Sequence, residues 1–164
     1  MTTRPDPVQA ADEAGRAQAR ALLAEARHAA LAYADPATGH PSIARIALGL
    51  DDRGEPLTFI SALSAHHAGL MADPRASVLV GEPGERGDPL THPRLMLQAM
   101  ARFVERSDPD HAILRELWLR DHPKAKLYID FPDFRFVRLE PGGALLNGGF
   151  GRALRLDRED LRPA

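Results

Sequence analysis

Two adjacent histidines, His66 and His67, follow two serines in the stretch FISALSAHH, residues 59–67. Hydroxyls and imidazoles at this density suggest a metal site, acid–base catalysis or an anion site. On a helix, neighbouring side chains point about 100° apart, so adjacent histidines do not readily hold one ion. The sequence contains neither an HExxH motif nor any cysteine. A zinc site is therefore less expected than two surface imidazoles at the start of a helix.

An anion site agrees best with the neighbouring residues. Ser64 is a suitable N-cap for a helix, and a helix N-terminus carries partial positive charge that suits a phosphate. Ser61 adds a hydroxyl, and a phosphate dianion favours the charged form of a nearby histidine. Arg45, on the expected preceding strand, could add a bidentate contact. By itself, such an arginine is more often a solvated strand residue.

The other motifs of the sequence give weaker indications of a function. The glycine-rich stretch GGFGRA, residues 148–153, has neither the GxxxxGK[ST] pattern of a P-loop nor the GxGxxG pattern of a dinucleotide fold. It predicts a tight turn that ends a strand. No GxSxG elbow marks a hydrolase. No residue stands out as a general acid or base, so no catalytic residue is assigned.

Hydrophobic periodicity predicts the elements that position these groups. Alanine-rich residues 10–34 have apolar positions at helical spacing and no proline, which predicts one helix. Period-two alternation then predicts strands, and Asp108 is a good N-cap for a second long helix. Residues 94–105 could form a helix by propensity, but their alternation favours a strand. The strands are expected at 42–50, 57–61, 76–81, 94–105 and, as two strands joined by a proline–glycine turn, 134–150. A short helix is expected at 64–73 and a long one at 108–123.

Composition indicates one globular domain. The chain has 164 residues, of which 44% are hydrophobic and 27% charged, with a net charge of −2. We expect a loose tail at residues 1–9 and a single domain at 10–164. The balanced charge disfavours nucleic-acid binding, and no apolar run is long enough to span a membrane. No segment resembles a signal peptide, so a cytoplasmic protein is expected.

The order of these segments resembles that of the FMN-binding split-barrel proteins related to pyridoxamine 5′-phosphate oxidase. It is most similar to the branch that includes haem-utilisation proteins. The resemblance runs from about residue 15 to 162 and rests on four stretches: SIARI, FISALSAHHAGLMADPRASVLV, DHPKAKLYIDFPDFRFVRLEP and LLNGGFGRA. It implies a mainly β fold with flanking helices, an antiparallel six-stranded split β-barrel. It also implies a homodimer with FMN bound between the subunits.

The resemblance also implies the site residues. Arg45, Ser61, His66 and His67, with Ser64 nearby, would hold the FMN phosphate. The backbone of Arg45, Ile46 and Ala47 and of Ile60, Ser61 and Ala62 would run along the isoalloxazine ring. Gln98 is a further candidate for a polar contact to the flavin.

Two departures from the family pattern leave the function open. The oxidase has Arg–Lys where this chain has His66–His67, and imidazoles are weaker cations near neutral pH. No histidine follows His122, whereas haem-degrading relatives ligate iron with a histidine near the C-terminus. The first hypothesis is a small FMN-dependent oxidoreductase with an unknown substrate. The alternatives are a haem-binding or haem-utilisation protein and a split-barrel scaffold without a cofactor.

Overall fold

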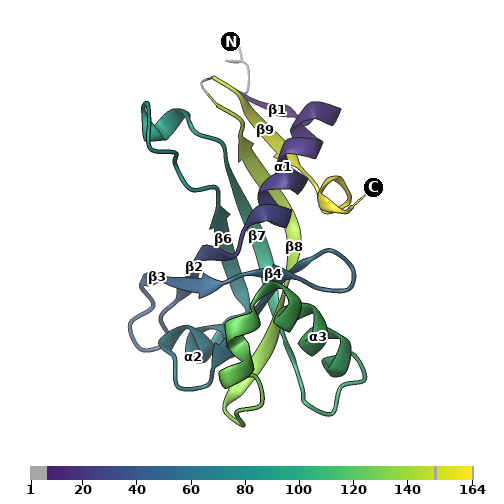
Figure 1. The fold of residues 1–164 in the computed structure, drawn as a ribbon. Coiled ribbons are helices and arrows are strands. Elements are labelled where there is room, and N and C mark those ends of the chain that lie inside the picture. Colours follow the sequence, from purple (N-terminus) through teal and green to yellow (C-terminus); the bar gives the residue numbers. More distant parts are fainter. Residues whose placement is uncertain (1–6, 150, 164) are drawn as a thin grey trace.

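The computed structural model describes residues 7–149 and 151–163, so residues 1–6 of the expected tail lie outside the described part. Figure 1 shows the arrangement of the elements. In chain order they are β1 (Val8–Ala10), α1 (Glu13–Glu25), β2 (His28–Ala34), β3 (Pro41–Ala47), β4 (Gly49–Leu50), β5 (Pro56–Ser61), α2 (Ala65–Ala72), β6 (Arg75–Val80), the 3-10 helix η1 (Pro89–Thr91), β7 (Arg94–Val104), α3 (His111–Asp121), η2 (Pro123–Leu127), β8 (Phe134–Asn147), β9 (Ala153–Leu156) and η3 (Glu159–Leu161).

One sheet contains all nine of these strands. Its main path is β1-β9-β8-β7-β6-β2-β3, and β5 pairs with both β4 and β8. Long β8 pairs with β7 along its length, with β5 at its start and with β9 at its end. The described pairings are antiparallel except that of β1 with β9, and they do not close into a ring.

The expectation of a mainly β fold with flanking helices is confirmed, whereas six antiparallel strands are not. Part of the difference comes from strands of two to four residues, β1, β4 and β9. Such short segments show too little alternation to be recognised from sequence.

The prediction of one helix through residue 34 is wrong. Helix α1 ends at Glu25, and His28–Ala34 form β2, which pairs with both β3 and β6. Alanine favours a helix but fits either element. Here Ala29 and Leu31 point into the core from one face of the strand, so tertiary pairing outweighs local propensity.

Two further local predictions are corrected. Pro141 and Gly142 do not form a turn, because β8 continues from Phe134 to Asn147 and Gly142 is the extra residue of a bulge opposite Gln98 and Ala99. Helix α3 is capped at Asp110, and the Asp108 carboxylate instead accepts the Asp110 N–H at 2.9 Å. The turn after β8 is confirmed at its described ends, since the Gly148 N–H donates to the Arg152 carbonyl at 2.9 Å, while Phe150 lies outside the described residues.

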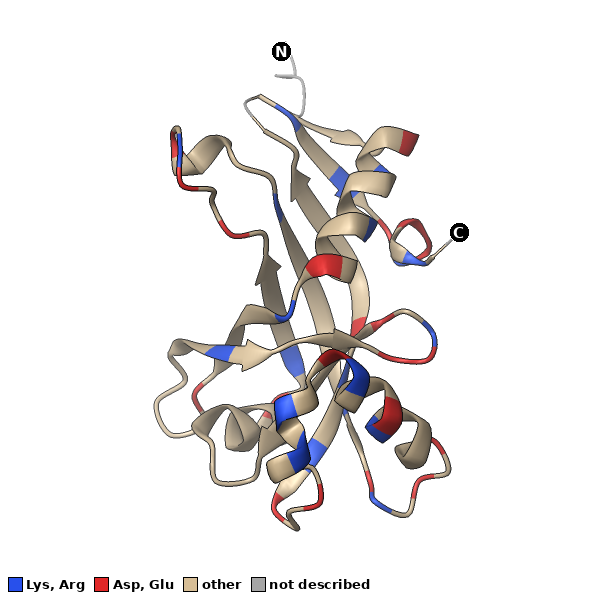
Figure 2. Ribbon diagram, in the orientation of Figure 1, with Lys and Arg blue, Asp and Glu red and all other residues tan. Residues whose placement is uncertain are grey.

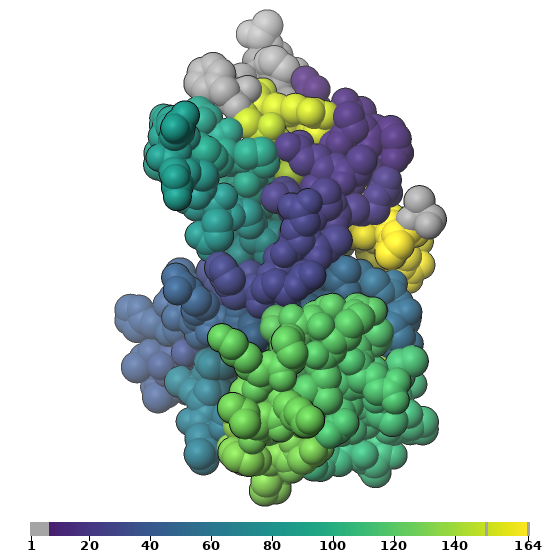
Figure 3. Space-filling view, viewed as in Figure 1, coloured from purple at the N-terminus to yellow at the C-terminus, as the bar shows by residue number. Residues whose placement is uncertain are grey.

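The core has two parts. The larger cluster joins the inner faces of β2, β6, β7 and β8 to α1, through residues such as Leu23, Leu31 and Leu97. The smaller, aromatic cluster lies between α3 with η2 and the opposite face of β5 and β8. The space-filling view shows α1 (purple) over the upper part of the molecule and the α3–η2 segment (green) over the lower part (Figure 3).

Charges of both signs gather on the loop between β4 and β5 and around α3, without a broad field of one sign (Figure 2). One arginine of this region, Arg138 on β8, is only 1% exposed. Its Nη1 contacts Asp51 and, at 3.0 Å, Asp52, while Nη2 donates to Asp110 at 2.9 Å. The buried guanidinium thus ties the β4–β5 loop and the start of α3 to the sheet. None of the described helices is both long and apolar enough to cross a bilayer.

Candidate functional site

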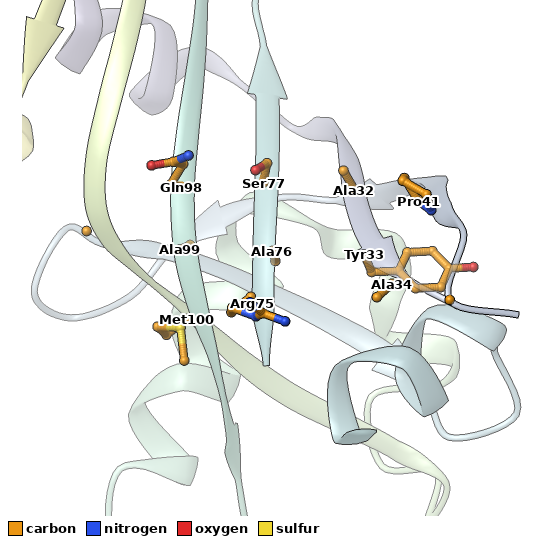
Figure 4. A pocket seen from close by; sticks show the side chains of 12 residues that line it. Ala32, Tyr33, Ala34, Pro41, Arg75, Ala76, Ser77, Gln98, Ala99 and Met100 are labelled. Carbon is orange, nitrogen blue, oxygen red and sulfur yellow. The ribbon is translucent and has the colours of Figure 1, made fainter. Parts of the chain in front are cut away.

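A hollow of about 510 Å³ lies on the outer face of the sheet, where neither α1 nor α3 covers it. Figure 4 shows the side chains that surround it. They are mostly small or apolar and come from β2, β6, β7, the β2–β3 loop, the start of β3 and the bulge of β8: Ala32, Tyr33, Ala34, Gly39, Pro41, Arg75, Ala76, Ser77, Gln98, Ala99, Met100 and Gly142. We call this site the hollow.

Strand register explains its shape. Gln98 pairs with Ser77 and Ser77 with Ala32, so their side chains form a row across three strands on the outer face. Two of the three are very small, which leaves a shallow depression with a polar amide at one end. Gln98, a predicted cofactor contact, therefore lies where a flat ligand could reach it (Figure 4).

Two arginines are available to this face. Arg75 lines the hollow, but its Nε and Nη2 bind Asp73 at 2.9 and 2.6 Å. These hydrogen bonds lower the pKa of Asp73 to about 2. Arg45 lies two residues from Ile43, which pairs with Ala32, so it shares the outer face. No hydrogen bond or ion pair of Arg45 occurs within the described residues, which leaves it available to an anion.

The remaining polar candidates form a separate group, the serine corner, made of Ser61, Ser64, His66, His67 and Asp133. Ser64 caps α2 as predicted: its Oγ accepts the His67 N–H at 3.3 Å and donates to the Ser61 carbonyl at 2.7 Å. Ser61 Oγ donates to Asp133 Oδ2 at 2.8 Å and accepts the Leu63 N–H at 3.1 Å. The Ser61 hydroxyl therefore already binds a carboxylate.

Both histidines are partly buried at the end of the core. His66 meets the Tyr33 ring edge-on at 6.2 Å, and His67 meets Phe103 at 5.0 Å. Burial lowers the pKa of both, with a further lowering by His67 in the case of His66 and by Arg135 in the case of His67. The neutral form of each imidazole is thereby favoured near neutral pH.

The structure thus distributes the ten predicted residues over different surroundings. In the described part of the chain, no hydrogen bond joins Arg45 to either histidine, and the cation acting on His67 is Arg135. Ile46 and Ile60 are each 4% exposed, so their side chains belong to the core and only their backbone could face a ligand. Ala47 is half-buried, with its carbonyl accepting the Thr58 hydroxyl at 2.7 Å, and Ala62 is exposed.

Sequence reasoning missed several residues of these sites. Tyr33 and Ser77 line the hollow, and Asp133 and Arg135 lie at the serine corner. Tyr33 was assigned to a helix, and no spacing pattern links Asp133 to Ser61, 72 positions away. Among residues 7–149 and 151–163, no group of three or more His, Asp or Glu side chains could hold a metal ion.

Comparison with known proteins places this geometry in a family. The model of the pyridoxamine 5′-phosphate oxidase family matches residues 16–146. A chloroplast heme oxygenase, HOZ, of Arabidopsis thaliana is 36% identical over 104 residues, which are 63% of this chain and 30% of that protein. The chain therefore spans less than a third of the length of this curated relative.

Solved structures that resemble this chain are consistent with the family match. The heme-binding protein of Mycobacterium smegmatis is 28% identical with a TM-score of 0.81, covering 98% of this chain and 61% of the other. A protein of unknown function from Agrobacterium tumefaciens is 35% identical with a TM-score of 0.79, covering 99% of this chain and 65% of the other. The family match spans most of the domain, from α1 to the end of β8, and so the chain belongs to the pyridoxamine 5′-phosphate oxidase family.

Proposed function

We propose that this protein binds haem in the hollow on its outer sheet face. The observation that carries the proposal is the combination of small, apolar walls with a few polar groups, which suits a large flat ligand. Two similar proteins, from Arabidopsis thaliana and Mycobacterium smegmatis, are named as a heme oxygenase and a heme-binding protein. Similarity to both supports haem as the ligand.

The residues around the hollow fit such a ligand. Met100 lines it, and a thioether is one of the groups used as a haem ligand, whereas the Tyr33 ring packs against the core and His66. Arg45, free of described partners on the same face, suits a propionate carboxylate. Bound haem would supply iron for redox or oxygen chemistry, while the chain orients the ring and limits its access to water.

We further propose that a second copy of the chain covers this face. Ile43, Leu79 and Met100 lie on it with 76%, 42% and 48% exposure, which is high for large apolar side chains. A homodimer would bury them together with the ligand. Light scattering at micromolar concentration should give twice the chain mass, and an Ile43→Asp/Leu79→Asp double variant should give the mass of one chain.

Hemin titration followed by absorption spectroscopy tests the main proposal. Wild-type protein should give a shifted Soret band that saturates at one haem per chain. Ala32→Trp, which fills the row between Ser77 and Ile43, should weaken hemin binding at least about tenfold, or about 1.4 kcal/mol. The matched control is Ala37→Trp on the exposed turn after β2, which should bind hemin normally. Equal binding by both variants would overturn the assignment to the hollow.

FMN-dependent oxidoreduction is the second candidate, favoured by the Ser64 cap at the start of α2 and by the free Arg45. FMN would supply hydride or electron transfer, with no substrate indicated by the residues present. This candidate expects micromolar protein to quench flavin fluorescence. It also expects His66→Ala/His67→Ala to weaken FMN binding by about 1–3 kcal/mol, the scale of charge-assisted hydrogen bonds.

A further inference from the structure

In the serine corner, a carboxylate accepts the hydrogen bond of the Ser61 hydroxyl. Asp133 Oδ2 accepts the Ser61 hydroxyl at 2.8 Å, and the Asp133 carbonyl accepts the Ala62 N–H at 2.6 Å. Two hydrogen bonds from consecutive residues therefore fix Asp133 against the end of β5. A ligand that needs the Ser61 proton must first break its bond to a charged acceptor.

In the described part of the chain, no ion pair joins the Asp133 carboxylate to a cation. Arg135 is the charged group that acts on His67, but its Nη1 already donates to the carbonyls of Pro132 at 2.6 Å and Phe134 at 2.9 Å. The two imidazoles of α2 are shielded from water and favour their neutral form. The corner thus places a carboxylate without an ion-pair partner beside two imidazoles that favour their neutral form, while the Arg135 guanidinium is held against backbone carbonyls.

A phosphate monoester carries close to two negative charges near neutral pH. In contrast to the corner of a phosphate site, where donors and cations converge, this corner places like charge against the ligand. The helix N-terminus of α2 offers only the modest attraction of its partial charge.

We propose that Asp133 is a specificity-determining residue that excludes phosphate monoesters, FMN included, from the serine corner. The exclusion rests on the contacts of Asp133 and on the weakly basic imidazoles beside it. Its consequence, that the protein selects a flat ligand without a phosphate, rests on the proposed haem function. A single carboxylate would thereby prevent this fold from binding FMN while leaving it able to bind haem.

The test restores the cations first and then removes the carboxylate. The double variant His66→Arg/His67→Lys and the triple variant, which adds Asp133→Asn, are titrated against FMN and riboflavin by flavin fluorescence. The asparagine amide oxygen can still accept the Ser61 hydroxyl, so the change removes charge and keeps the bond. The triple variant should bind FMN at least about tenfold more tightly than the double variant, with riboflavin affinity equal in the two.

A matched control replaces Asp130, on the same loop, whose carboxylate pairs with Arg115 at 2.8 Å. Adding Asp130→Asn to the double variant should leave FMN affinity unchanged. Equal FMN affinity in the double and triple variants, including no measurable binding by either, would overturn the role of Asp133. So would tight FMN binding by the wild-type chain.

Hemin titration of the same proteins separates the two proposals. If wild type binds no hemin while the triple variant gains FMN binding, the haem function fails and the role of Asp133 stands. If hemin binds but the triple variant gains nothing, the reverse holds. Circular dichroism and urea unfolding confirm that each variant is folded.

Discussion

On the side of the sheet away from the larger core cluster, two regions are filled in opposite ways, and we call them the covered face and the open face. Where β5 and the first half of β8 face α3, the chain fills the space with large rings: Phe59 lies 4.6 Å from Phe136 and 6.1 Å from Trp118. Where β2, β6 and β7 face outward, the row of Ala32, Ser77 and Gln98 contains two very small side chains, and a hollow remains. The covered face stabilises the fold, whereas the open face is left for a ligand or a second copy.

The largest expected effect is on the covered face. Trp118 is 2% exposed, so Trp118→Ala should lower the free energy of unfolding by about 3–5 kcal/mol through lost burial and a residual cavity. Urea unfolding measures this change. If the variant does not fold, Leu114→Ala, at a fully buried position of the same cluster, should cost about 2–5 kcal/mol. A cost below about 1 kcal/mol for either would remove the contrast between the faces.

The next effect on the free energy of unfolding is expected at the buried arginine, Arg138. Arg138→Met removes the nearest partner of Asp51, whose side chain is 0% exposed, and leaves it the longer contact of 3.6 Å with Arg53, so the change should cost about 3–5 kcal/mol. The double variant Arg138→Met/Asp51→Asn should recover part of that loss, because it removes the buried charge and keeps an oxygen that can accept the Arg53 and Glu55 N–H groups. Urea unfolding of the single and double variants measures the recovery, and a strictly additive result would contradict the explanation.

A smaller, pH-dependent effect on the free energy of unfolding is expected at Glu55. Its carboxylate binds Arg158 through two bonds of 2.6 and 2.7 Å, and this pairing lowers the pKa of Glu55. Because the folded state favours the ionised carboxylate, the pair stabilises the fold at neutral pH. This contribution is lost as the pH falls through the pKa of Glu55 in the folded state. Glu55→Gln should therefore cost about 1–3 kcal/mol near neutral pH.

The pH series is the control for that prediction. Urea unfolding from about pH 7 down to about pH 3 should show the wild type and Glu55→Gln converging as the carboxylate is protonated. Arg162→Gln, which removes the longer contact of 3.8 Å to Glu55, should show a weaker trend. A constant difference across the series would show that charge is not the cause.

The smallest effect on stability is expected on the open face. Met100, 48% exposed, should tolerate Met100→Ala within about 0.5 kcal/mol in urea unfolding. Hemin affinity of the same variant should nevertheless fall, because Met100 lines the hollow. Stability and binding thus respond oppositely on the two faces. A Met100→Ala variant that is clearly destabilised but binds hemin normally would reverse the comparison.

Prediction from sequence succeeded where periodicity was strong and local. The strand at Arg94–Val104 was predicted from its alternation, and Ser64 was predicted as a cap from its hydroxyl and position. The error at His28–Ala34 arose because alanine satisfies both helical and strand patterns. Gly142 was mistaken for part of a turn because a bulge is defined by the opposite strand, here Gln98 and Ala99.

In the candidate site too, relations between chain neighbours were predictable from sequence, and relations between distant segments were not. Sequence identified Ser61, Ser64, His66 and His67 as a group, and they do lie together because they are neighbours in the chain. It could not reveal that Asp133 meets Ser61, or that Ala32, Ser77 and Gln98 share a row, since those contacts join distant segments. Whether the ten predicted residues bind a cofactor stays a prediction.

By itself, the sequence determined the family, most of the strands and the chemical groups available at each position. Those properties follow from local pattern and residue type. Only the tertiary structure decided which of the groups face one another: a carboxylate against the Ser61 hydroxyl, two histidines shielded from water, and small side chains aligned beneath an open face. Burial and cross-strand register fix these relations, and neither is a property of a short stretch of chain.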